Sequence, residues 1–446
     1  MENQLYGEQT RLAEENFRLG GRKVNGALIY AMTEVKKAAA MTYQKLLPEK
    51  KELYQAMEKA CDMILAGEKQ EENIAGIPFE QVFVTDALQG GAGTSTHMNV
   101  NEVLATLTQK ELCKLHGVTE PGEAERVHPL DDINKGQSTN DVYPTALRIA
   151  AIQKLRGLSE ECAMLQTALQ EKENQYDTVK KLGRTELMDA VPITLGKEFG
   201  AYAQAIARDR WRLYKVEERL RQTNLGGTAV GNGNNSSHKY QAMVIENLRA
   251  LTGIGLARAE YPMDMTQNQD VFVEVSGLLK ALAVNLMKIA NDLRLMNSGP
   301  DGGFGEISLA KMQAGSTIMP GKVNPVMAEL TMQVSMKVMA NDTAITMAAA
   351  HGEFELNAFL PLVADALLES LELLTGTVRL FREKCIKTLK AREERCRELL
   401  EGSHAFAAEY TNKLGYDNVA EMIEKYGEDS KMVQEKLRAL VREEDR

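Results

Sequence analysis

The sequence is poor in aromatic residues and in positive charge, and each shortage excludes a class of protein. Aromatic residues make up only 5% of the 446 residues, which disfavours β-sandwiches and β-barrels. The formal net charge of −10 argues against nucleic acid and anionic membranes as partners, because both require a basic surface. Hydrophobic residues reach 44% and methionines number 22, so we predict an all-α fold of packed helices.

The five cysteines follow no pattern of disulfide or zinc binding. Their number is odd, no two are spaced as CxxC, and no paired histidines lie near them in the sequence. We therefore expect a reducing compartment, the cytoplasm, with no metal and no cofactor. The first ten residues are polar and acidic, and charges interrupt the apolar runs, so we expect neither a signal peptide nor a membrane-spanning segment.

Five long runs repeat apolar residues with helical spacing, which predicts long helices at residues 145–180, 195–221, 271–296, 326–350 and 357–382. The run at 271–296 is apolar nearly all round, which is typical of a helix at the centre of a bundle shared between subunits. We predict three domains: a mostly helical one at 1–135, a central long-helix bundle at 136–395, and a short helical one at 396–446.

Four polar segments lie between the helical runs: GTSTHMNVNE at 93–102, QSTND at 137–141, GRTELMDAVP at 183–192 and QAGSTIMPGKVNP at 313–325. Hydroxyl and N–H groups at a helix start bind anions, although serine and threonine there more often act as plain N-caps. A fifth segment, NLGGTAVGNGNN at 224–235, is the richest in glycine. It lacks the GK[ST] ending of a P-loop and follows no predicted strand, so we do not predict nucleotide binding.

The segment at 313–325 carries the most chemistry. Ser316 is a candidate proton acceptor, and Lys322 supplies a positive charge that would favour its alkoxide. Gly315 and Gly321 would let backbone N–H groups turn toward an anion. The alternative interpretation is a connector of glycine and proline with ordinary surface residues.

Taken together and in this order, the four polar segments resemble those of the aspartase/fumarase superfamily of lyases, from about Tyr6 to about Tyr416. The resemblance implies a homotetramer whose central domains assemble a twenty-helix core, with each active site built from three subunits. It also implies a small dicarboxylate or amino acid substrate and a β-elimination that yields fumarate.

The resemblance implies that Ser316 is the catalytic base, helped by Lys322, and that the α-carboxylate of the substrate is bound by Thr185, Lys322 and Asn324. The carboxylate beside the carbon that loses its proton would be bound by four hydroxyls, those of Thr94, Ser138, Thr139 and Thr317. Asn140 would reach the leaving group. Removing a proton beside a carboxylate creates an aci-carboxylate, so several hydrogen-bond donors must converge on it before the charge develops.

The motifs QSTND, DAVP and VNPVMAE are more similar to those of aspartate ammonia-lyases than to those of fumarases. This resemblance implies reversible loss of ammonia from L-aspartate. Glu186 stands where fumarases typically carry histidine. A carboxylate there would attract an ammonium, unless the side chain points away from the site. A fumarase, a lyase acting on an N-substituted aspartate, and a catalytically silent helical scaffold remain alternatives.

Three residues depart from the pattern of the superfamily. His97 replaces an asparagine, Asp132 replaces a histidine, and Asp301 stands where an arginine is usual. Asp301 and Glu186 would both make the site more acidic than in the superfamily. These two residues therefore leave the identity of the amine that departs open.

Overall fold

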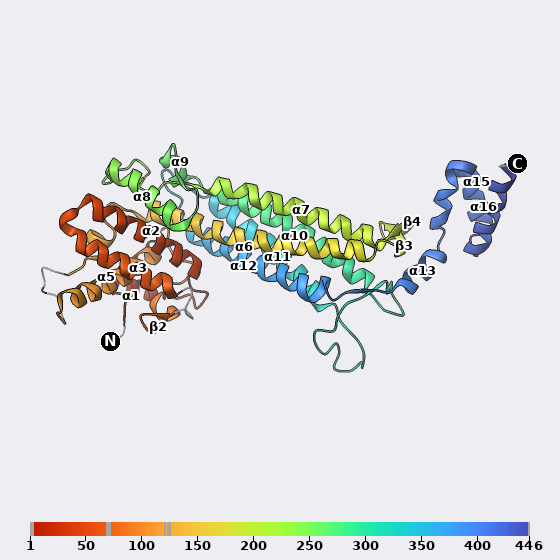
Figure 1. Ribbon diagram of the computed structural model, residues 1–446, viewed down its shortest axis with the longest axis horizontal. Coiled ribbons are helices and arrows are strands. Elements are labelled where there is room, and N and C mark those ends of the chain that lie inside the picture. Colours follow the sequence, from red (N-terminus) through yellow and green to blue (C-terminus); the bar gives the residue numbers. More distant parts are fainter. Residues whose placement is uncertain (1–3, 68–72, 120–121, 123–125, 445–446) are drawn as a thin grey trace. The chain divides into compact units, whose positions relative to one another are not determined.

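The computed structural model describes residues 4–67, 73–119, 122 and 126–444. Its contacts divide the chain into two compact units: unit 1 comprises Met1–Ser159, Trp211–Ala281 and Lys337–Leu373, and unit 2 comprises Glu160–Arg210, Leu282–Met336 and Leu374–Arg446. The division falls within five long helices (Figure 1): α6 Thr139–Gln175, α7 Leu195–Leu220, α10 Asp270–Met296, α11 Val326–Ala349 and α12 Leu360–Phe381. The predicted all-α fold and its five long helices are confirmed.

Helix α6 begins at Thr139, earlier than predicted, and Pro144 lies inside it. A proline has no N–H to donate to the carbonyl four residues before it, which here belongs to Asn140. The Asn224 side chain donates to that carbonyl instead, with Nδ2 3.0 Å from the oxygen. The helix therefore passes through Pro144 without leaving the Asn140 carbonyl unpaired.

Unit 1 contains a cluster of helices around α2 (Gly26–Leu46), which packs against α3 (Lys51–Gly67) and α8 (His238–Thr252). Helix α3 in turn packs against α5 (Thr94–His116), as Figure 1 shows. Three tyrosines join α2, α3 and α8. The ring of Tyr43 stacks on those of Tyr54 and Tyr240, at centroid distances of 5.2 and 4.9 Å. Helix α2 is buried on most of its circumference, which makes it the centre of this cluster.

The remaining elements of unit 1 are short. They are the helices α1 Glu8–Asn16, η1 Pro48–Lys50, α4 Phe79–Val82, η3 Pro129–Ile133 and α9 Pro262–Gln267, the antiparallel pair β1 Asn73–Ile74 and β2 Ile77–Pro78, and the parallel pair β5 Gln222–Thr223 and β6 Ala257–Arg258.

The N-terminal helix α1 is held by one carboxylate of α5. Glu102 accepts hydrogen bonds from the backbone N–H groups of Gly7, Gln9 and Thr10 at 2.9, 3.0 and 3.1 Å, and from the Thr10 hydroxyl at 2.6 Å. The N-cap residue Gly7 has no side chain to satisfy these N–H groups. The carboxylate therefore caps the helix and complements the positive end of its dipole.

In unit 2 the predicted polar segment at 183–192 forms an antiparallel hairpin of β3 (Lys180–Thr185) and β4 (Met188–Thr194). The two turn residues, Glu186 and Leu187, have φ values of 55° and 67°. Positive φ at both central residues is the geometry of a type I′ turn, whose twist matches that of paired strands. Glu186 and Leu187 are not one of the glycine-containing pairs that usually mark this turn, so the sequence did not reveal the hairpin.

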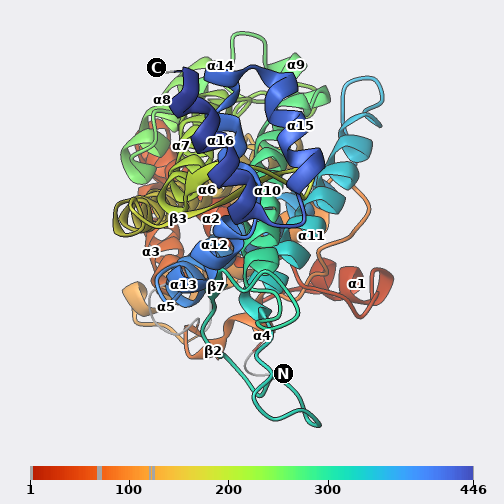
Figure 2. The same ribbon diagram turned by 90° about the vertical axis from the view of Figure 1, so that its right-hand side faces the viewer.

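The C-terminal part of unit 2 consists of short helices, as predicted. Helices α15 and α16 lie side by side (Figures 1 and 2) over a small core that includes Leu414, Val419, Val433 and Leu437. The other elements of this unit are β7 Ile307–Ser308 paired with β8 Lys390–Ala391, and the helices η4 Arg382–Ile386, α13 Glu393–Glu401, η5 Ala405–Glu409, α14 Thr411–Leu414, α15 Tyr416–Tyr426 and α16 Ser430–Glu444.

Within the residues that the structure describes, none of the helices combines the length and the apolar character needed to cross a lipid bilayer. The division into three domains at residues 135 and 395 stays a prediction.

We predict that replacing Glu102 by alanine lowers the free energy of unfolding by about 2–4 kcal/mol, because four donors at the start of α1, two of them on the buried Thr10, lose one charged acceptor. Glu111→Ala is the matched control on the same helix: Glu111 meets Lys114 only at 4.0 Å, and surface pairs of this kind contribute about 1 kcal/mol or less. Urea denaturation followed by circular dichroism measures both. Equal stabilities of the two variants would contradict the role assigned to Glu102.

Candidate active site

The start of α6 is a capping box. Ser138 Oγ accepts a hydrogen bond from the N–H of Asn140 at 3.2 Å, and Asp141 Oδ1 accepts one from the N–H of Ser138 at 3.0 Å. The capping interpretation of this segment is therefore correct for Ser138. A hydroxyl that accepts a hydrogen bond still has its own proton to donate. Capping thus leaves Ser138 able to bind an anion at the helix start.

Asp141 also organises the glycine-rich segment at 224–235. Its Oδ2 accepts hydrogen bonds from the N–H groups of Gly226 and Thr228, both at 3.0 Å, and the residue is fully buried. Burial raises the pKa of Asp141 to about 6, against the opposing effect of these backbone donors and of the Lys36 ammonium. This part of the segment binds a carboxylate of its own chain. Sequence reasoning missed Asp141, although the S-x-x-D spacing of a capping box, from Ser138 to Asp141, marks it.

The side chain of Asn140 has a defined orientation. Its Nδ2 donates to the carbonyl of Ala229 at 2.7 Å, which assigns the amide nitrogen to that side. The Oδ1 atom is then the acceptor of the group. Asn140 is therefore set to accept a hydrogen bond from a ligand that carries N–H or O–H groups.

The start of α5 meets the start of α6. His97 Nδ1 lies 2.9 Å from Thr139 Oγ1, and Gly93, with φ of 95°, lies so close to the Tyr143 ring that a Cβ atom would be 2.3 Å from it. Glycine is therefore required at this contact. Thr94, one turn before His97, donates its hydroxyl to the carbonyl of Gly91 at 2.7 Å, so it must rotate before it can donate to a ligand.

Unit 1 thus contains four of the predicted site residues, Thr94, Ser138, Thr139 and Asn140, at two adjoining helix starts. Ser138, together with Thr228 and Ala229, lines a hollow of about 700 Å³. The hollow can admit a small dicarboxylate.

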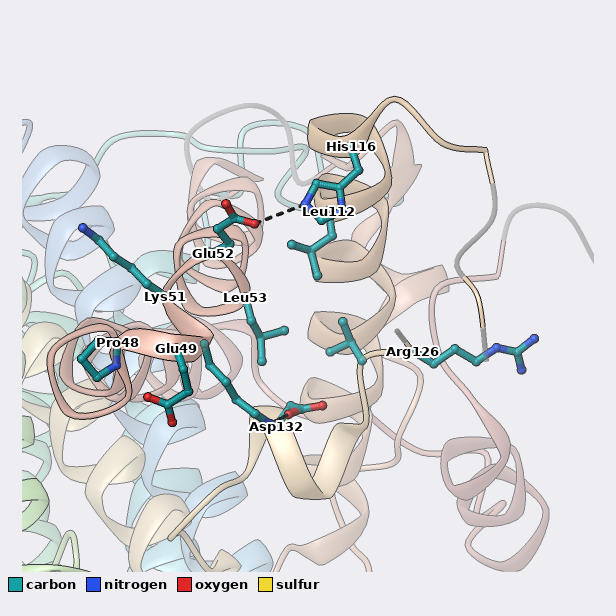
Figure 3. Close-up of a pocket in the computed structure, with 11 residues that line it drawn as sticks. Pro48, Glu49, Lys51, Glu52, Leu53, Leu112, His116, Arg126 and Asp132 are labelled. Atoms are coloured by element: carbon teal, nitrogen blue, oxygen red, sulfur yellow. Dashed lines mark hydrogen bonds and ion pairs between the residues drawn. The ribbon is translucent and has the colours of Figure 1, made fainter. Parts of the chain in front are cut away.

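A second hollow of unit 1, of about 560 Å³, contains none of the predicted site residues (Figure 3). His116 Nε2 lies 3.2 Å from a carboxylate oxygen of Glu52, and Lys50 pairs with Asp132 at 2.8 Å. The Arg126 side chain extends away from the other side chains in the figure. Four of the charged groups here thus form two pairs and do not converge on one point.

In unit 2, Thr185 and Glu186 are exposed at the turn of the β3–β4 hairpin. The hairpin is anchored by the fully buried carboxylate of Glu306, which pairs with Lys181 at 3.0 Å and with Arg184 at 2.9 Å. Arg184 also lies over the ring of Phe304, 4.3 Å from its centre. Buried pairs of this kind hold the hairpin in place at the cost of desolvating both charges.

Glu186 lines a hollow of about 420 Å³ in unit 2 whose charged groups are balanced. Lys181, Arg184 and Lys288 supply positive charges, and Glu198 and Asp292 join Glu186 as negative ones. Burial raises the pKa of Glu198, while the Lys181 ammonium opposes this shift.

The segment at 313–325 belongs to the long loop that connects β7 to α11, drawn in teal in Figure 1. Ser316 Oγ accepts hydrogen bonds from the N–H groups of Ile318 and Met319, at 3.1 and 2.9 Å. The sequence suggested that the N–H groups of Gly315 and Gly321 would bind an anion here. The N–H groups that donate to this oxygen are instead those of Ile318 and Met319. Both donors would stabilise a negative charge on the oxygen.

The two ends of this loop contact each other. Asn324 Nδ2 donates to the carbonyl of Gly315 at 2.6 Å, and a Cβ atom on Gly315 would lie 1.5 Å from the carbonyl oxygen of Lys322. Only glycine fits there, which explains the glycine before Ser316. Thr317 and Lys322 are exposed, and Gly321 has φ of 84°. Thr317, Lys322 and Asn324 thus lie in the same short loop as Ser316.

Comparisons with known proteins establish the family of the chain. Residues 1–340 match the model of a lyase family. An aspartate ammonia-lyase from a Bacillus species is 41% identical over 94% of this chain and 86% of its own length. The class II fumarate hydratase of Corynebacterium efficiens is 40% identical over 94% of this chain and 84% of its own length.

Among solved structures, the fumarate lyase:delta crystallin of Brucella melitensis bound to cobalt has a TM-score of 0.89 and 40% identity, over 98% of this chain and 95% of that one. The sequence match and the structural match each extend over most of the chain. The chain therefore belongs to this family of lyases, the aspartase/fumarase superfamily.

Proposed function

We propose that the protein is an aspartate ammonia-lyase, which removes ammonia reversibly from L-aspartate to give fumarate. The observation that carries the proposal is the environment of Ser316, whose oxygen accepts two backbone N–H groups in a loop that also contains Lys322. A serine is a weak base unless its alkoxide is stabilised, and these groups supply that stabilisation. The 41% identity to an aspartate ammonia-lyase over most of the chain supports this substrate.

In the proposed reaction, the Ser316 alkoxide takes a proton from the carbon beside the β-carboxylate. The electron pair spreads into that carboxylate as an aci-carboxylate, whose two negative oxygens are bound by the hydroxyls of Thr94, Ser138, Thr139 and Thr317. The pair then forms the double bond of fumarate, and the carbon–nitrogen bond breaks, so ammonia leaves with the electrons of that bond. Donors placed before the charge develops lower the barrier without having to reorganise.

The other groups bind and orient the substrate. Thr185, Lys322 and Asn324 bind the α-carboxylate, and Asn140 accepts a hydrogen bond from the amino group. The hydrogen bond from Asn140 Nδ2 to the Ala229 carbonyl supports this role, since it leaves the amide oxygen as the acceptor for a ligand. Glu186 adds negative charge that favours an ammonium over a third carboxylate.

We further propose a homotetramer in the cytoplasm whose active sites combine residues of three subunits. Thr94, Ser138, Thr139 and Asn140 belong to unit 1, whereas Thr185, Glu186, Thr317, Ser316, Lys322 and Asn324 belong to unit 2. An arrangement in which neighbouring subunits supply different groups brings every proposed residue to one substrate.

A fumarase is the second candidate, because a class II fumarate hydratase is 40% identical to the chain. We expect purified protein to produce fumarate from L-aspartate, seen as a rise in ultraviolet absorbance. L-Malate and argininosuccinate are the matched controls. Turnover of malate or argininosuccinate without turnover of aspartate would overturn the ammonia-lyase assignment.

Replacing Ser316 by alanine should lower kcat by about 10³-fold, within the range that a general base contributes. Ser316 is half-buried in a loop outside the helices, so the fold should survive, and the melting temperature should stay close to that of the unmodified protein. Ser298→Ala is a control that removes a serine hydroxyl from a different loop of unit 2, between α10 and β7, where Ser298 Oγ accepts a hydrogen bond from the N–H of Phe304 at 3.1 Å. A Ser316→Ala variant that keeps its activity would exclude the serine as the base.

Shared active sites predict that two inactive variants restore activity in mixed oligomers. Ser316→Ala removes a group of unit 2, and Asn140→Ala removes a group of unit 1, so a mixed assembly contains some sites with both groups intact. Co-expression with two different affinity tags isolates the mixed species, and each variant alone is the control. Mixed species as inactive as their parents would contradict sites shared between subunits.

A further inference from the structure

His97 is a buried histidine for which the proposed reaction has no role. It is 1% exposed, and its Nδ1 lies 2.9 Å from Oγ1 of Thr139, one of the proposed substrate-binding hydroxyls. Its Nε2 is buried and has no hydrogen-bond partner among the residues that the structure describes. His97 also stands where the superfamily usually has asparagine, so its role is not defined by the resemblance.

The imidazole of His97 is neutral. Burial, and then the ammonium of Lys36, hold its pKa well below the ordinary value. A neutral imidazole carries one proton, so one ring nitrogen donates a hydrogen bond and the other accepts. Which nitrogen carries the proton decides whether Thr139 accepts from His97 or donates to it.

One consideration places the proton on Nδ1. A buried N–H without an acceptor is rarer in proteins than an acceptor with an unused lone pair, so the unpartnered Nε2 is better left as the lone pair. Lys36 is fully buried, with its Nζ 2.8 Å from Asn134 Oδ1, and burial lowers the pKa of its ammonium to about 7. Its charge contributes to keeping the ring neutral, whereas the tautomer follows from the hydrogen-bond partners of the two nitrogens.

We propose that His97 is a positioning residue that donates its Nδ1–H to Thr139 Oγ1 and thereby directs the Thr139 proton toward the carboxylate of the substrate. A threonine hydroxyl has one proton and two lone pairs, and this hydrogen bond uses a lone pair only. The proton then remains for the oxygen on which negative charge develops. The inference rests on the proposed function, because it assigns Thr139 to the substrate carboxylate.

A double-mutant cycle with succinate as the probe tests the coupling. Succinate has both carboxylates and no leaving group, so calorimetry measures its binding without any chemistry. We expect His97→Leu and Thr139→Val each to weaken binding about tenfold, as expected for loss of a hydrogen bond to a charged group. The double variant should bind no more weakly than Thr139→Val alone.

His97→Asn is the matched control, because an asparagine amide can place an N–H near the position of Nδ1–H. We expect this variant to stay within about threefold of the unmodified protein, since the donor is retained. Additive losses in the double variant, or equal losses in His97→Asn and His97→Leu, would overturn the proposal.

The tautomer is tested separately, by magic-angle-spinning nuclear magnetic resonance of the full protein with ¹⁵N-labelled histidine. The His97 signals are identified by their loss in His97→Asn, so this measurement does not require His97→Leu to fold. We expect a protonated Nδ1 and an unprotonated Nε2, and the reverse would overturn the proposal. If His97 and Thr139 are coupled in succinate binding but the protein does not turn over aspartate, only the ammonia-lyase assignment is overturned. If the protein turns over aspartate but the two residues are not coupled, only the inference about His97 is overturned.

Discussion

The arrangement of the candidate site in unit 1 depends on one buried carboxylate. Asp141 accepts hydrogen bonds from three backbone N–H groups in two segments that lie far apart in the sequence, that of Ser138 in one and those of Gly226 and Thr228 in the other. It thereby fixes the start of α6 and the glycine-rich segment in one geometry. Asn140 adds a second contact between the same two segments, because its amide donates to the carbonyl of Ala229, next to Thr228. A buried carboxylate with several donors is costly to disrupt, since each donor would be left without a partner.

Backbone groups have a corresponding role in unit 2. The oxygen of Ser316 is served by the N–H groups of Ile318 and Met319, and the hairpin with Thr185 is anchored through Glu306. In both units the proposed reacting or binding groups are thus oriented by contacts that do not involve the substrate. Such preorganisation is the usual source of electrostatic catalysis, because the donors need not be ordered during the reaction.

Much of the fold was predictable from the sequence, because long helices repeat apolar residues with a clear period. The candidate site residues were predicted from a resemblance in four short segments, and their assembly in one active site stays a prediction. What the sequence did not indicate are contacts between distant segments. The hairpin at 180–194 was missed because its turn pair, Glu186 and Leu187, is not one of the glycine-containing pairs that mark a two-residue hairpin turn. The start of α6 was misplaced because Asn224 compensates for Pro144 from far along the chain. Neither the hairpin nor the start of α6 could be recognised from the residues nearest to it in the sequence.

The closed base of the Ser316 loop has a consequence for the entropy of binding. An open loop of this length would lose conformational freedom at many residues when it orders over a ligand, and that loss would weaken binding. Here Asn324 already bonds to the carbonyl of Gly315, and Gly315 lies against the carbonyl of Lys322. Much of the ordering has therefore occurred in the free protein. The loop can therefore bind a ligand with little further ordering, and the Ser316 oxygen already accepts both N–H groups before the ligand binds.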